Sequence, residues 1–176
     1  MIPTLVSPRL VLRPARAEDA DALHAHYRDP DAMRYWSHAP HTDPAQTRAT
    51  IEGAIRAQTW RLWAVTLAGD DAAIGTLAVG EHRPGVVQIG YSLLRAHGGR
   101  GLAREAVVAV LDWLFGAEGL RRVFADIDPD NAPSRRLVEA LGFTLEGVLR
   151  AEWETHIGVR DTCLYALLAT EWRVSS

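Results

Sequence analysis

The stretch LLRAHGGRGLA, residues 93–103, carries the clearest structural signal in the sequence. A strand ends there, glycines follow, and a long helix begins. Glycine lets the backbone turn tightly and approach a ligand closely. The first N–H groups of a helix have no partner within the helix, and with the helix dipole they attract phosphate. The stretch therefore predicts a phosphate site at a helix start, although a plain strand-to-helix connector has the same pattern.

Two common phosphate motifs are excluded at this turn. The dinucleotide fingerprint needs glycine or alanine three places after its second glycine, where this chain has Arg104 after Gly101. The P-loop needs Gly-Lys-Ser/Thr after its glycines, and the sequence has no such run. A phosphate at this turn would therefore belong to another kind of ligand site.

Apolar segments on both sides of the turn predict the strands of one sheet. These segments are Leu10–Pro14, Trp63–Leu67, Ile74–Val79, Val86–Leu93, Val123–Ile127, Phe143–Trp153 and Arg160–Thr170. Helical patterns with capping residues predict helices between them. These patterns cover Glu18–Tyr27, Pro44–Gln58, Arg100–Phe115 and Pro133–Ala140. Short connections make the second to fourth strands an antiparallel meander, and the order of elements indicates a mixed α/β (α+β) sheet with helices on both faces.

The composition fits one soluble globular domain spanning residues 1–176. Apolar residues make up 48% and charged residues 23%, with a formal net charge of -3. This balance argues against a nucleic-acid or membrane surface, which usually shows a basic excess, although Arg95, Arg100 and Arg104 lie close together. A single cysteine excludes an internal disulfide. Because the start lacks a signal-peptide pattern and no apolar run has membrane-spanning length, a cytoplasmic protein is expected.

A second strand-to-helix junction, DPDNAPSRR at residues 128–136, carries polar side chains. Asn131 suits the N-cap of the following helix, and capping leaves the rest of its amide free for a ligand. Ser134 lies in the first turn, where a serine hydroxyl is usually solvated or capping. Each residue alone indicates local structure, but the two junctions together make a far more specific pattern.

Together these motifs resemble the GNAT acetyltransferase superfamily, and most closely its ribosomal-protein N-terminal acetyltransferase branch, the RimJ/RimL type. The matching stretches, in order along nearly the whole chain, are Met33–Trp36, Gln88–Tyr91, Gly99–Ala103 with Glu105 and Ala106, Asn131 with Ser134, Leu141–Phe143, Glu146–Leu149, Asp161 and Tyr165. The resemblance implies a mixed, mostly antiparallel twisted sheet of about six to seven strands. It also implies transfer of acetyl from acetyl-CoA to a primary amine, either a protein N-terminal α-amine or a small-molecule amine. A non-catalytic acyl-CoA-binding sensor or partner module on the same fold is the alternative.

The resemblance also implies ligand contacts. The backbone of Leu93 and Leu94 would pair with the pantetheine amides of the coenzyme. The pyrophosphate would be held by the N–H groups of Gly98, Gly99, Arg100, Gly101, Leu102 and Ala103. Asn131 would contact the pantetheine arm, and Ser134 would stabilise or protonate the leaving thiolate. The amine would attack the thioester directly, without an acyl-enzyme.

Three positions depart from the family pattern. Ala96 stands where Gln or Arg often precedes the first motif glycine, so either the adjacent Arg95 or the backbone alone must serve there. Gln88 stands where relatives often have Glu. Val138 stands where many members place a tyrosine acid, which shifts proton donation to the serine described above or to Tyr165.

The general base is left open by the sequence. The strand position where the ribosomal-protein branch has a glutamate is Trp153 here, flanked by Glu152 and Glu154. Side chains alternate across a strand, so a one-residue shift changes faces unless a bulge intervenes. Glu152 and Glu154 are therefore both candidates, and a chain of water molecules is the alternative.

Three residues are candidates for the acceptor site. Trp36 and its neighbour Tyr35 lie in an irregular segment, and aromatic residues in loops often contact ligands. Asp126, an acid on a predicted core strand, would hold a substrate ammonium or serve the structure. The histidines lack the spacing of metal ligands and Cys163 fits a buried thiol, so no metal is expected. Either a monomer or a homodimer is compatible with the sequence.

Overall fold

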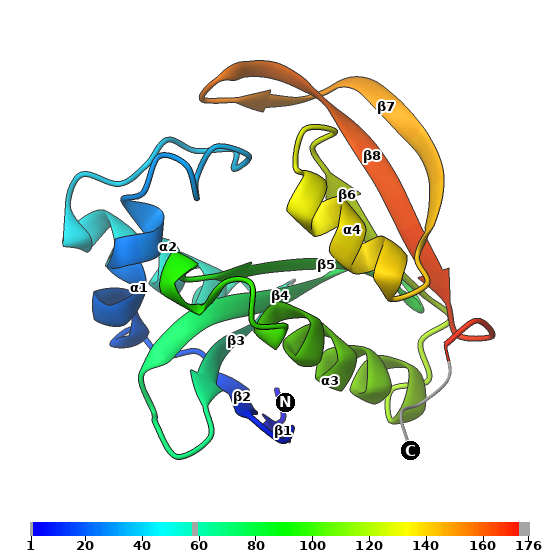
Figure 1. Ribbon diagram of the computed structural model, residues 1–176, viewed down its shortest axis with the longest axis horizontal. Helices are drawn as coiled ribbons and strands as arrows, with labels where there is room; N and C mark the ends of the chain where they lie inside the picture. Colours follow the sequence, from blue (N-terminus) through cyan, green and yellow to red (C-terminus); the bar gives the residue numbers. More distant parts are fainter. Residues whose placement is uncertain (1, 58–59, 173–176) are drawn as a thin grey trace.

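Eight strands form one mixed sheet in the computed structural model, which describes residues 2–57 and 60–172 (Figure 1). The strands are β1 (Leu5–Val6), β2 (Leu10–Pro14), β3 (Trp60–Leu67), β4 (Ala73–Arg83), β5 (Val86–Leu93), β6 (Arg122–Ile127), β7 (Thr144–Thr155) and β8 (Gly158–Leu168). Their order is β1-β2-β3-β4-β5-β6-β8-β7, and only the β5–β6 pair is parallel among these strands. The predicted mostly antiparallel sheet is confirmed, with one strand more than the upper end of the expected range.

Helices cover both faces of this sheet, as predicted. They are α1 (Asp19–Tyr27), α2 (Pro44–Arg56), α3 (Leu102–Gly116) and α4 (Ala132–Ala140), and a short 3-10 turn, η1 (Arg95–His97), precedes α3. On β3, Trp63 and Val65 point into the core that α3 and α4 cover. The alternating Leu62 and Ala64 point into a second core against α1 and α2. Burial on both faces explains why β3 is apolar along most of its length.

The predicted boundaries differ from the observed ones mainly at strand ends. Asp43 caps α2 as expected, because its carboxylate accepts from the Ala45 N–H at 2.7 Å. The helix ends at Arg56, and its predicted end near Gln58 lies outside the described residues. β3 begins three residues early, at Trp60, because its ladder with β4 continues to Gly80. The two-residue β1 was not predicted, since so short a strand has no readable period.

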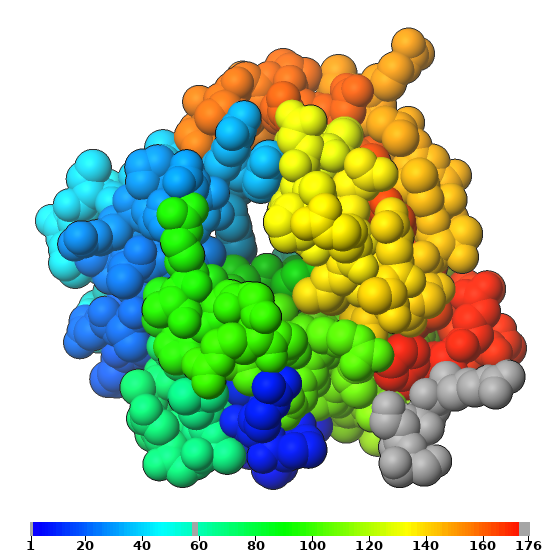
Figure 2. Space-filling model, viewed as in Figure 1, coloured from blue at the N-terminus to red at the C-terminus, as the bar shows by residue number. Residues whose placement is uncertain are grey.

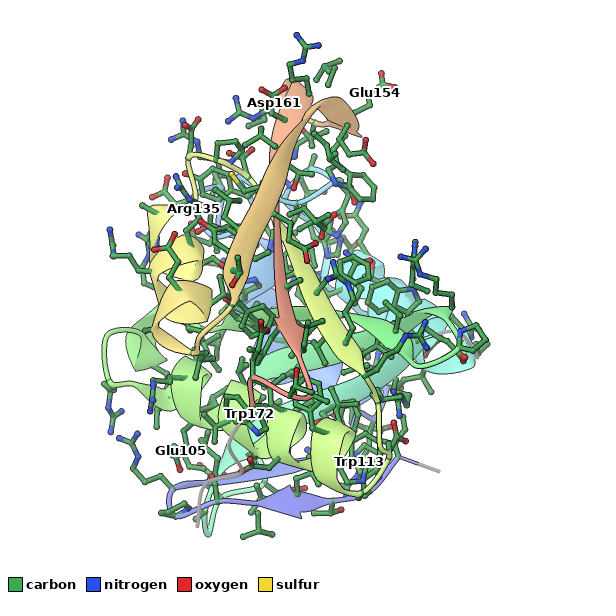
Figure 3. All side chains as sticks on the ribbon, turned by 90° about the vertical axis from the view of Figure 1, so that its right-hand side faces the viewer. Glu105, Trp113, Arg135, Glu154, Asp161 and Trp172 are labelled. Atoms are coloured by element: carbon green, nitrogen blue, oxygen red, sulfur yellow. The ribbon has the colours of Figure 1, made fainter. Side chains whose placement is uncertain are left out.

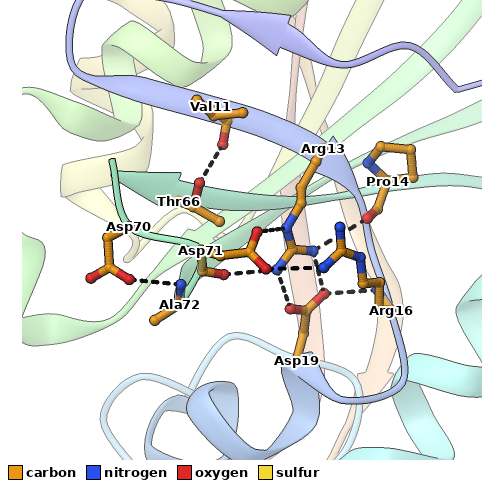
Figure 4. Close-up of polar contacts among 9 residues, drawn as sticks. All are labelled: Val11, Arg13, Pro14, Arg16, Asp19, Thr66, Asp70, Asp71 and Ala72. Carbon is orange, nitrogen blue, oxygen red and sulfur yellow. Dashed lines mark hydrogen bonds and ion pairs between the residues drawn. The ribbon is translucent and has the colours of Figure 1, made fainter. Parts of the chain in front are cut away.

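A buried guanidinium links β2 to α1 and to the turn between β3 and β4 (Figure 4). Arg13 donates to both carboxylate oxygens of Asp19, at 2.6 and 2.9 Å, and to Asp71 at 2.6 Å. The hydrogen bond with Asp19 raises the pKa of Arg13, and the hydrogen bond from Arg13 lowers the pKa of the exposed Asp71 carboxyl. Loss of Arg13 would leave the buried Asp19 carboxylate without its ion pair. The pair therefore fixes α1 against the sheet.

The parallel strands β5 and β6 pair only at their beginnings. Residues 86–88 face residues 122–124, and no ladder pair joins the two strands further along within the described chain. Beyond Gln88, β5 stays with β4 as far as Leu93, whereas β6 stays with β8 as far as Ile127. The carboxyl ends of the two strands therefore diverge and leave a gap in the middle of the sheet.

Candidate active site

The glycine turn before α3 presents a run of free backbone donors. Gly99 and Gly101 have φ of 70° and 74°, a conformation that glycine adopts without strain, and Gly101 is the N-cap of α3. In the described part of the chain, the N–H groups of residues 99–104 donate to no protein acceptor. The Gly98 N–H donates to the Arg95 carbonyl at 3.0 Å, so the free run begins one residue later than predicted. Such donors at a helix start favour an anion.

A clamp from the first hairpin holds this turn. The Glu105 carboxylate accepts from the Ser7 hydroxyl and the Arg9 N–H, both at 2.8 Å, and from Arg9 Nε at 2.6 Å. Arg9 Nη1 also donates to the Arg100 carbonyl at 3.0 Å. Arg9 therefore offsets the charge of Glu105 beside the anion position. No local pattern in the sequence indicates this clamp, because 91 to 98 residues separate the partners.

We expect Glu105→Gln to lower the free energy of unfolding by roughly 1 kcal/mol at neutral pH, with the loss vanishing in acid. Burial raises the pKa of the Glu105 carboxyl, but hydrogen bonds from Ser7 and Arg9 outweigh it and hold that pKa below the usual 4.5. A depressed folded-state pKa stabilises the fold above 4.5, and this contribution is lost as the pH falls through the folded value. Urea unfolding of both proteins between about pH 7 and pH 3 measures the difference. A stability gap of constant size across that range would contradict the expectation.

Leu93 and Leu94, at the end of β5, were predicted to pair with the coenzyme through their backbone groups. Only Leu93 remains available for this, because the backbone groups of Leu94 already bond within the protein. The Leu94 N–H donates to the Ile74 carbonyl at 2.8 Å, and the Leu94 carbonyl accepts from the His97 N–H at the same distance. Leu93 instead lines a cavity next to the glycine turn. Arg95 lines the same cavity, but its guanidinium donates to Asp31 at 3.0 Å. The backbone is therefore the better candidate for phosphate contact where the family often has Gln or Arg.

Asn131 and Ser134 meet Tyr91 across the gap between β5 and β6. The Asn131 side-chain oxygen accepts from the Ser134 N–H at 3.3 Å and caps α4, as predicted. Within the described residues, its amide nitrogen has no hydrogen-bond partner and stays available to a ligand. Ser134 Oγ lies 2.8 Å from the Tyr91 hydroxyl. Burial raises the pKa of Tyr91 to about 12, so the phenol is protonated at neutral pH.

Tyr91 is a site residue that sequence reasoning missed. It was visible only as the last residue of the Ile-Gly-Tyr motif, and a motif on β5 says nothing of a contact with α4. Val138, which stands where the family often has its tyrosine, is fully buried in the core. A tyrosine hydroxyl therefore does reach Ser134 in this chain, but the tyrosine lies on β5 and not on α4.

Three cavities follow one another through the gap, and Figure 2 shows the surface hollowed between the light-blue segment near residue 35 and the yellow α4 region. The inner cavity, about 460 Å³, is lined by Leu93 and the start of α3. The central cavity, about 210 Å³, lies between Tyr91 and Asp126. The outer cavity, about 350 Å³, continues from Asp126. Tyr35 and Trp36 line all three, so one path leads from the glycine turn to Asp126.

The structure brings together the three predicted acceptor residues. The Asp126 carboxylate accepts from Gln88 Nε2 and, at 2.8 Å, from Trp153 Nε1. The Tyr35 hydroxyl donates to the Asp130 carbonyl at 3.2 Å, which places this loop against the end of β6. Asp126, Tyr35 and Trp36 line both the central and the outer cavity. The arrangement suits an amine held on the sheet face opposite α3 and α4.

The two candidate bases flank Trp153 beyond a bulge in β7. The register with β8 shifts before Trp153, and Ala151 has a positive φ of 53°. The bulge allows Trp153 to reach Asp126. Glu152 lines a neighbouring cavity together with Asp126 and Trp153. Glu154 stands at the outer edge of the β7–β8 hairpin (Figure 3) and lines none of these cavities, so the structure separates the two glutamates.

Tyr165, a predicted proton donor, lies away from the gap. Its side chain is fully buried, its hydroxyl donates to the Glu139 carboxylate, and it accepts from Arg135 Nε at 3.1 Å. It lines none of the three cavities. Since the contacts of its hydroxyl are with the outer residues of α4, the thiolate acid must be sought in Ser134 and Tyr91 instead.

The other reactive side chains among the described residues form no second candidate active site or metal site. Cys163 is buried, as expected. His24 and His41 both bond to Thr47 Oγ1, at 2.8 and 2.9 Å. No three His, Cys, Asp or Glu side chains within residues 2–57 and 60–172 are arranged to hold a metal ion. Among the helices described, none has the length and apolar character needed to cross a membrane.

A sheet that diverges between two parallel strands, next to a helix start with free N–H groups, suits an acyltransferase that uses coenzyme A. The acetyltransferase (GNAT) domain pattern matches residues 9–144, and the chain belongs to this family. It is 34% identical to the uncharacterized N-acetyltransferase p20 of Bacillus licheniformis, over 96% of this chain and 98% of that one. The chain is accordingly an N-acetyltransferase.

Solved structures with similar folds agree with this assignment. An acetyltransferase of the GNAT family from Bacillus anthracis has a TM-score of 0.87 and 26% identity, covering 96% of this chain and all of that one. RimJ of Mycobacterium smegmatis, in complex with CoA-disulfide, has a TM-score of 0.84 and 27% identity, covering 99% and 91%. The fold and the family are therefore established.

Proposed function

We propose that the protein transfers the acetyl group of acetyl-CoA to a primary amine by direct attack in a ternary complex. The observation that carries this proposal is the path from the free N–H groups of residues 99–104, through the central cavity, to Asp126. One end suits the phosphates of the coenzyme and the other suits an ammonium group. Two substrates bound from the two ends would meet at the gap, in the orientation that transfer requires.

Acetyl-CoA supplies an activated acetyl thioester, and the residues of the chain hold and orient it. The backbone of the glycine turn binds the pyrophosphate, and the free Asn131 amide nitrogen donates to the pantetheine arm. Ser134, with Tyr91 behind it, directs a hydroxyl at the position of the sulfur. On the other side of the gap, the Asp126 carboxylate attracts a cationic acceptor into the two cavities that it lines.

The amine nitrogen must lose a proton before it attacks. Glu152 is the better placed of the two glutamates, because it lines a cavity together with Asp126 and Trp153. The proton passes from the nitrogen to a water molecule and then to Glu152. The new C–N bond forms as the C–S bond breaks. Ser134 gives its hydroxyl proton to the departing thiolate and regains the second proton that the attacking nitrogen releases through water, so the products are the acetylated amine and the thiol of coenzyme A.

Within the family we propose the RimJ/RimL type, acting in the cytoplasm as a monomer or a homodimer. The Met33–Trp36 segment supports this type, because it resembles that branch in sequence and because Tyr35 and Trp36 line the whole path. The likeness to RimJ of Mycobacterium smegmatis, which is in complex with CoA-disulfide, also supports it. The acceptor would then be a protein N-terminal α-amine or a small-molecule amine.

We expect acetyl-CoA to raise the melting temperature of the protein. Ligand at about 100 times its dissociation constant adds about 2.7 kcal/mol of stability. For a chain of this length, that corresponds to a shift on the order of 5–10 °C. Thermal unfolding with and without acetyl-CoA measures it, with AMP as a control that lacks the pantetheine arm. No shift at millimolar acetyl-CoA would contradict the proposed coenzyme site.

Turnover is tested by thiol release with a panel of primary amines. Binding without thiol release would favour a non-catalytic acyl-CoA-binding module. Intact mass of the enzyme after acetyl-CoA treatment tests direct attack. All 19 Lys and Arg residues of the sequence are arginine, so no lysine can take up acetyl and blur the result. A stable acetylated serine, tyrosine or cysteine that an amine then discharges would overturn direct attack.

A further inference from the structure

We infer that the acceptor carries a second cationic group beyond the amine that is acetylated, an inference that rests on the proposed function. The central cavity, between Tyr91 and Asp126, is the place for the reacting amine. The outer cavity continues beyond it for about 350 Å³, which is room for a further group of a small ligand. The residues that line the outer cavity therefore indicate the chemistry of the part of the acceptor that does not react.

Three indole rings line the outer cavity. Trp60 and Trp153 are 38% and 45% exposed, and Trp36 is half-buried. Large aromatic side chains left open on a concave wall are typical of a binding surface. Indole faces attract ammonium and guanidinium groups through the ring quadrupole. A cation that enters this cavity therefore meets aromatic faces from three separate segments of the chain.

Gly80 provides the space that the Trp60 ring occupies. Trp60 pairs with Gly80, and Gly80 pairs with Gln88, so the three residues form a row across β3, β4 and β5. A Cβ atom at position 80 would lie 2.7 Å from the Trp60 ring. The indole therefore lies over the glycine, in the same cavity as Gln88, which holds Asp126. Its contact with Gly80 therefore fixes the position of the Trp60 ring on the sheet.

The outer cavity also carries a net negative charge. Three carboxylates line it, those of Asp126, Asp128 and Asp161, against the single guanidinium of Arg160. Arg160 pairs with Asp128 at 2.8 Å and with Asp130 at 2.6 Å, so its positive charge is already offset.

Asp126 itself has only neutral donors, the Gln88 amide and the Trp153 indole. Within the described chain it forms no ion pair. A partly buried carboxylate without a counter-ion favours a cationic ligand. A neutral or anionic extension of the acceptor would gain nothing from Asp126 and would be repelled if negative. The chemical class that fits is a primary amine joined by a short alkyl chain to a guanidinium or ammonium group.

The test compares three amines of similar length as acceptors in a thiol-release assay: 4-aminobutylguanidine, 5-aminopentanamide and n-hexylamine. We expect kcat/KM to be at least about 10-fold higher for the guanidine than for either neutral amine, mostly through KM. Asp126→Asn and Trp153→Leu should each remove most of that preference. The second variant changes a half-exposed side chain, so it preserves the fold. Asp21→Asn, an exposed carboxylate on α1, is the matched control and should keep the preference.

Equal kcat/KM values for the three amines would overturn the inference and leave the proposed function intact. If none of the three amines releases thiol, calorimetric titration of the CoA-saturated protein tests the cation site independently of turnover. Tighter binding of the guanidine than of the pentanamide, lost in Asp126→Asn, supports the cation site even though the proposed function then fails. Equal or undetectable binding of both overturns the inference. A preference that survives both Asp126→Asn and Trp153→Leu would also overturn it, because the discrimination would then arise elsewhere.

Discussion

Gly101→Val is expected to weaken acetyl-CoA binding by about 30-fold while the protein remains folded, since a lost charge-assisted hydrogen bond is worth roughly 2 kcal/mol. Gly101 is the N-cap of α3, with φ of 74°. Valine in that conformation is strained by about 1–2 kcal/mol. If the backbone relaxes to negative φ instead, the N–H groups of the next residues turn away from the anion position. This change of direction reduces phosphate binding at the start of α3.

The control for this variant is Gly119→Val. Gly119 also has a positive φ, 64°, and a Cβ there would meet no atom within 4 Å. It lies in the turn after α3, at the opposite end of that helix from Gly101. The two variants should therefore lose similar stability, but only Gly101→Val should lose affinity for acetyl-CoA. Calorimetric titration and urea unfolding of both variants measure this, and equal affinity of Gly101→Val and wild type would disprove a phosphate site at the turn.

Much of the fold was predictable from the sequence because local physics decides it. The strand Val86–Leu93 was predicted with its observed bounds, since apolar residues alternate along it from Val87 to Leu93 between two turns. The starts of α2 and α4 followed from Asp43 and Asn131, which are N-caps in the structure as well. The extension of β3 to Trp60 was not predictable, because it depends on pairing with β4 rather than on its own residues.

The site was predictable only where its residues are close in sequence. The glycine turn and the Asn131–Ser134 pair are local features, so the sequence pointed to both. The contact between Tyr91 and Ser134 joins residues 43 positions apart, and no periodicity encodes it. The bulge at Ala151 was likewise hidden, because a non-glycine residue with positive φ leaves no compositional mark. These contacts arise only when the sheet diverges and α4 packs beside the gap.

The divergence of β5 and β6 also explains how the two faces of the sheet share one reaction. Tyr91 packs against the core beneath α3 and α4, whereas Gln88 and Asp126 lie on the opposite face. In a continuous sheet, the paired backbone would separate these groups. The gap removes that barrier over a few residues only. A coenzyme held from one face and an amine held from the other can therefore meet without either entering the core.

Ser134→Ala is expected to lower kcat by about 100-fold, and Tyr91→Phe by about 10-fold, because a positioned proton donor at the leaving group contributes on that order. In the proposed mechanism Ser134 faces the sulfur, and the Tyr91 hydroxyl, 2.8 Å from Ser134 Oγ, would orient the serine proton toward it. Tyr91, with its pKa raised to about 12 by burial, stays protonated throughout the working range. Neither variant should therefore change the pH profile of kcat below about pH 9.

The decisive measurement is the double variant. If Tyr91 acts through Ser134, adding Tyr91→Phe to Ser134→Ala should lower kcat no further, whereas independent contributions would multiply. KM for acetyl-CoA should stay within about threefold of wild type in all three proteins, since the hydroxyls act on the departing thiolate rather than on coenzyme binding. Thr66→Val, which removes a hydroxyl bonded to the Val11 carbonyl far from the gap, should leave kcat unchanged. Multiplicative losses in the double variant would show that Tyr91 and Ser134 work separately, and the phenol would then be a structural contact between β5 and α4.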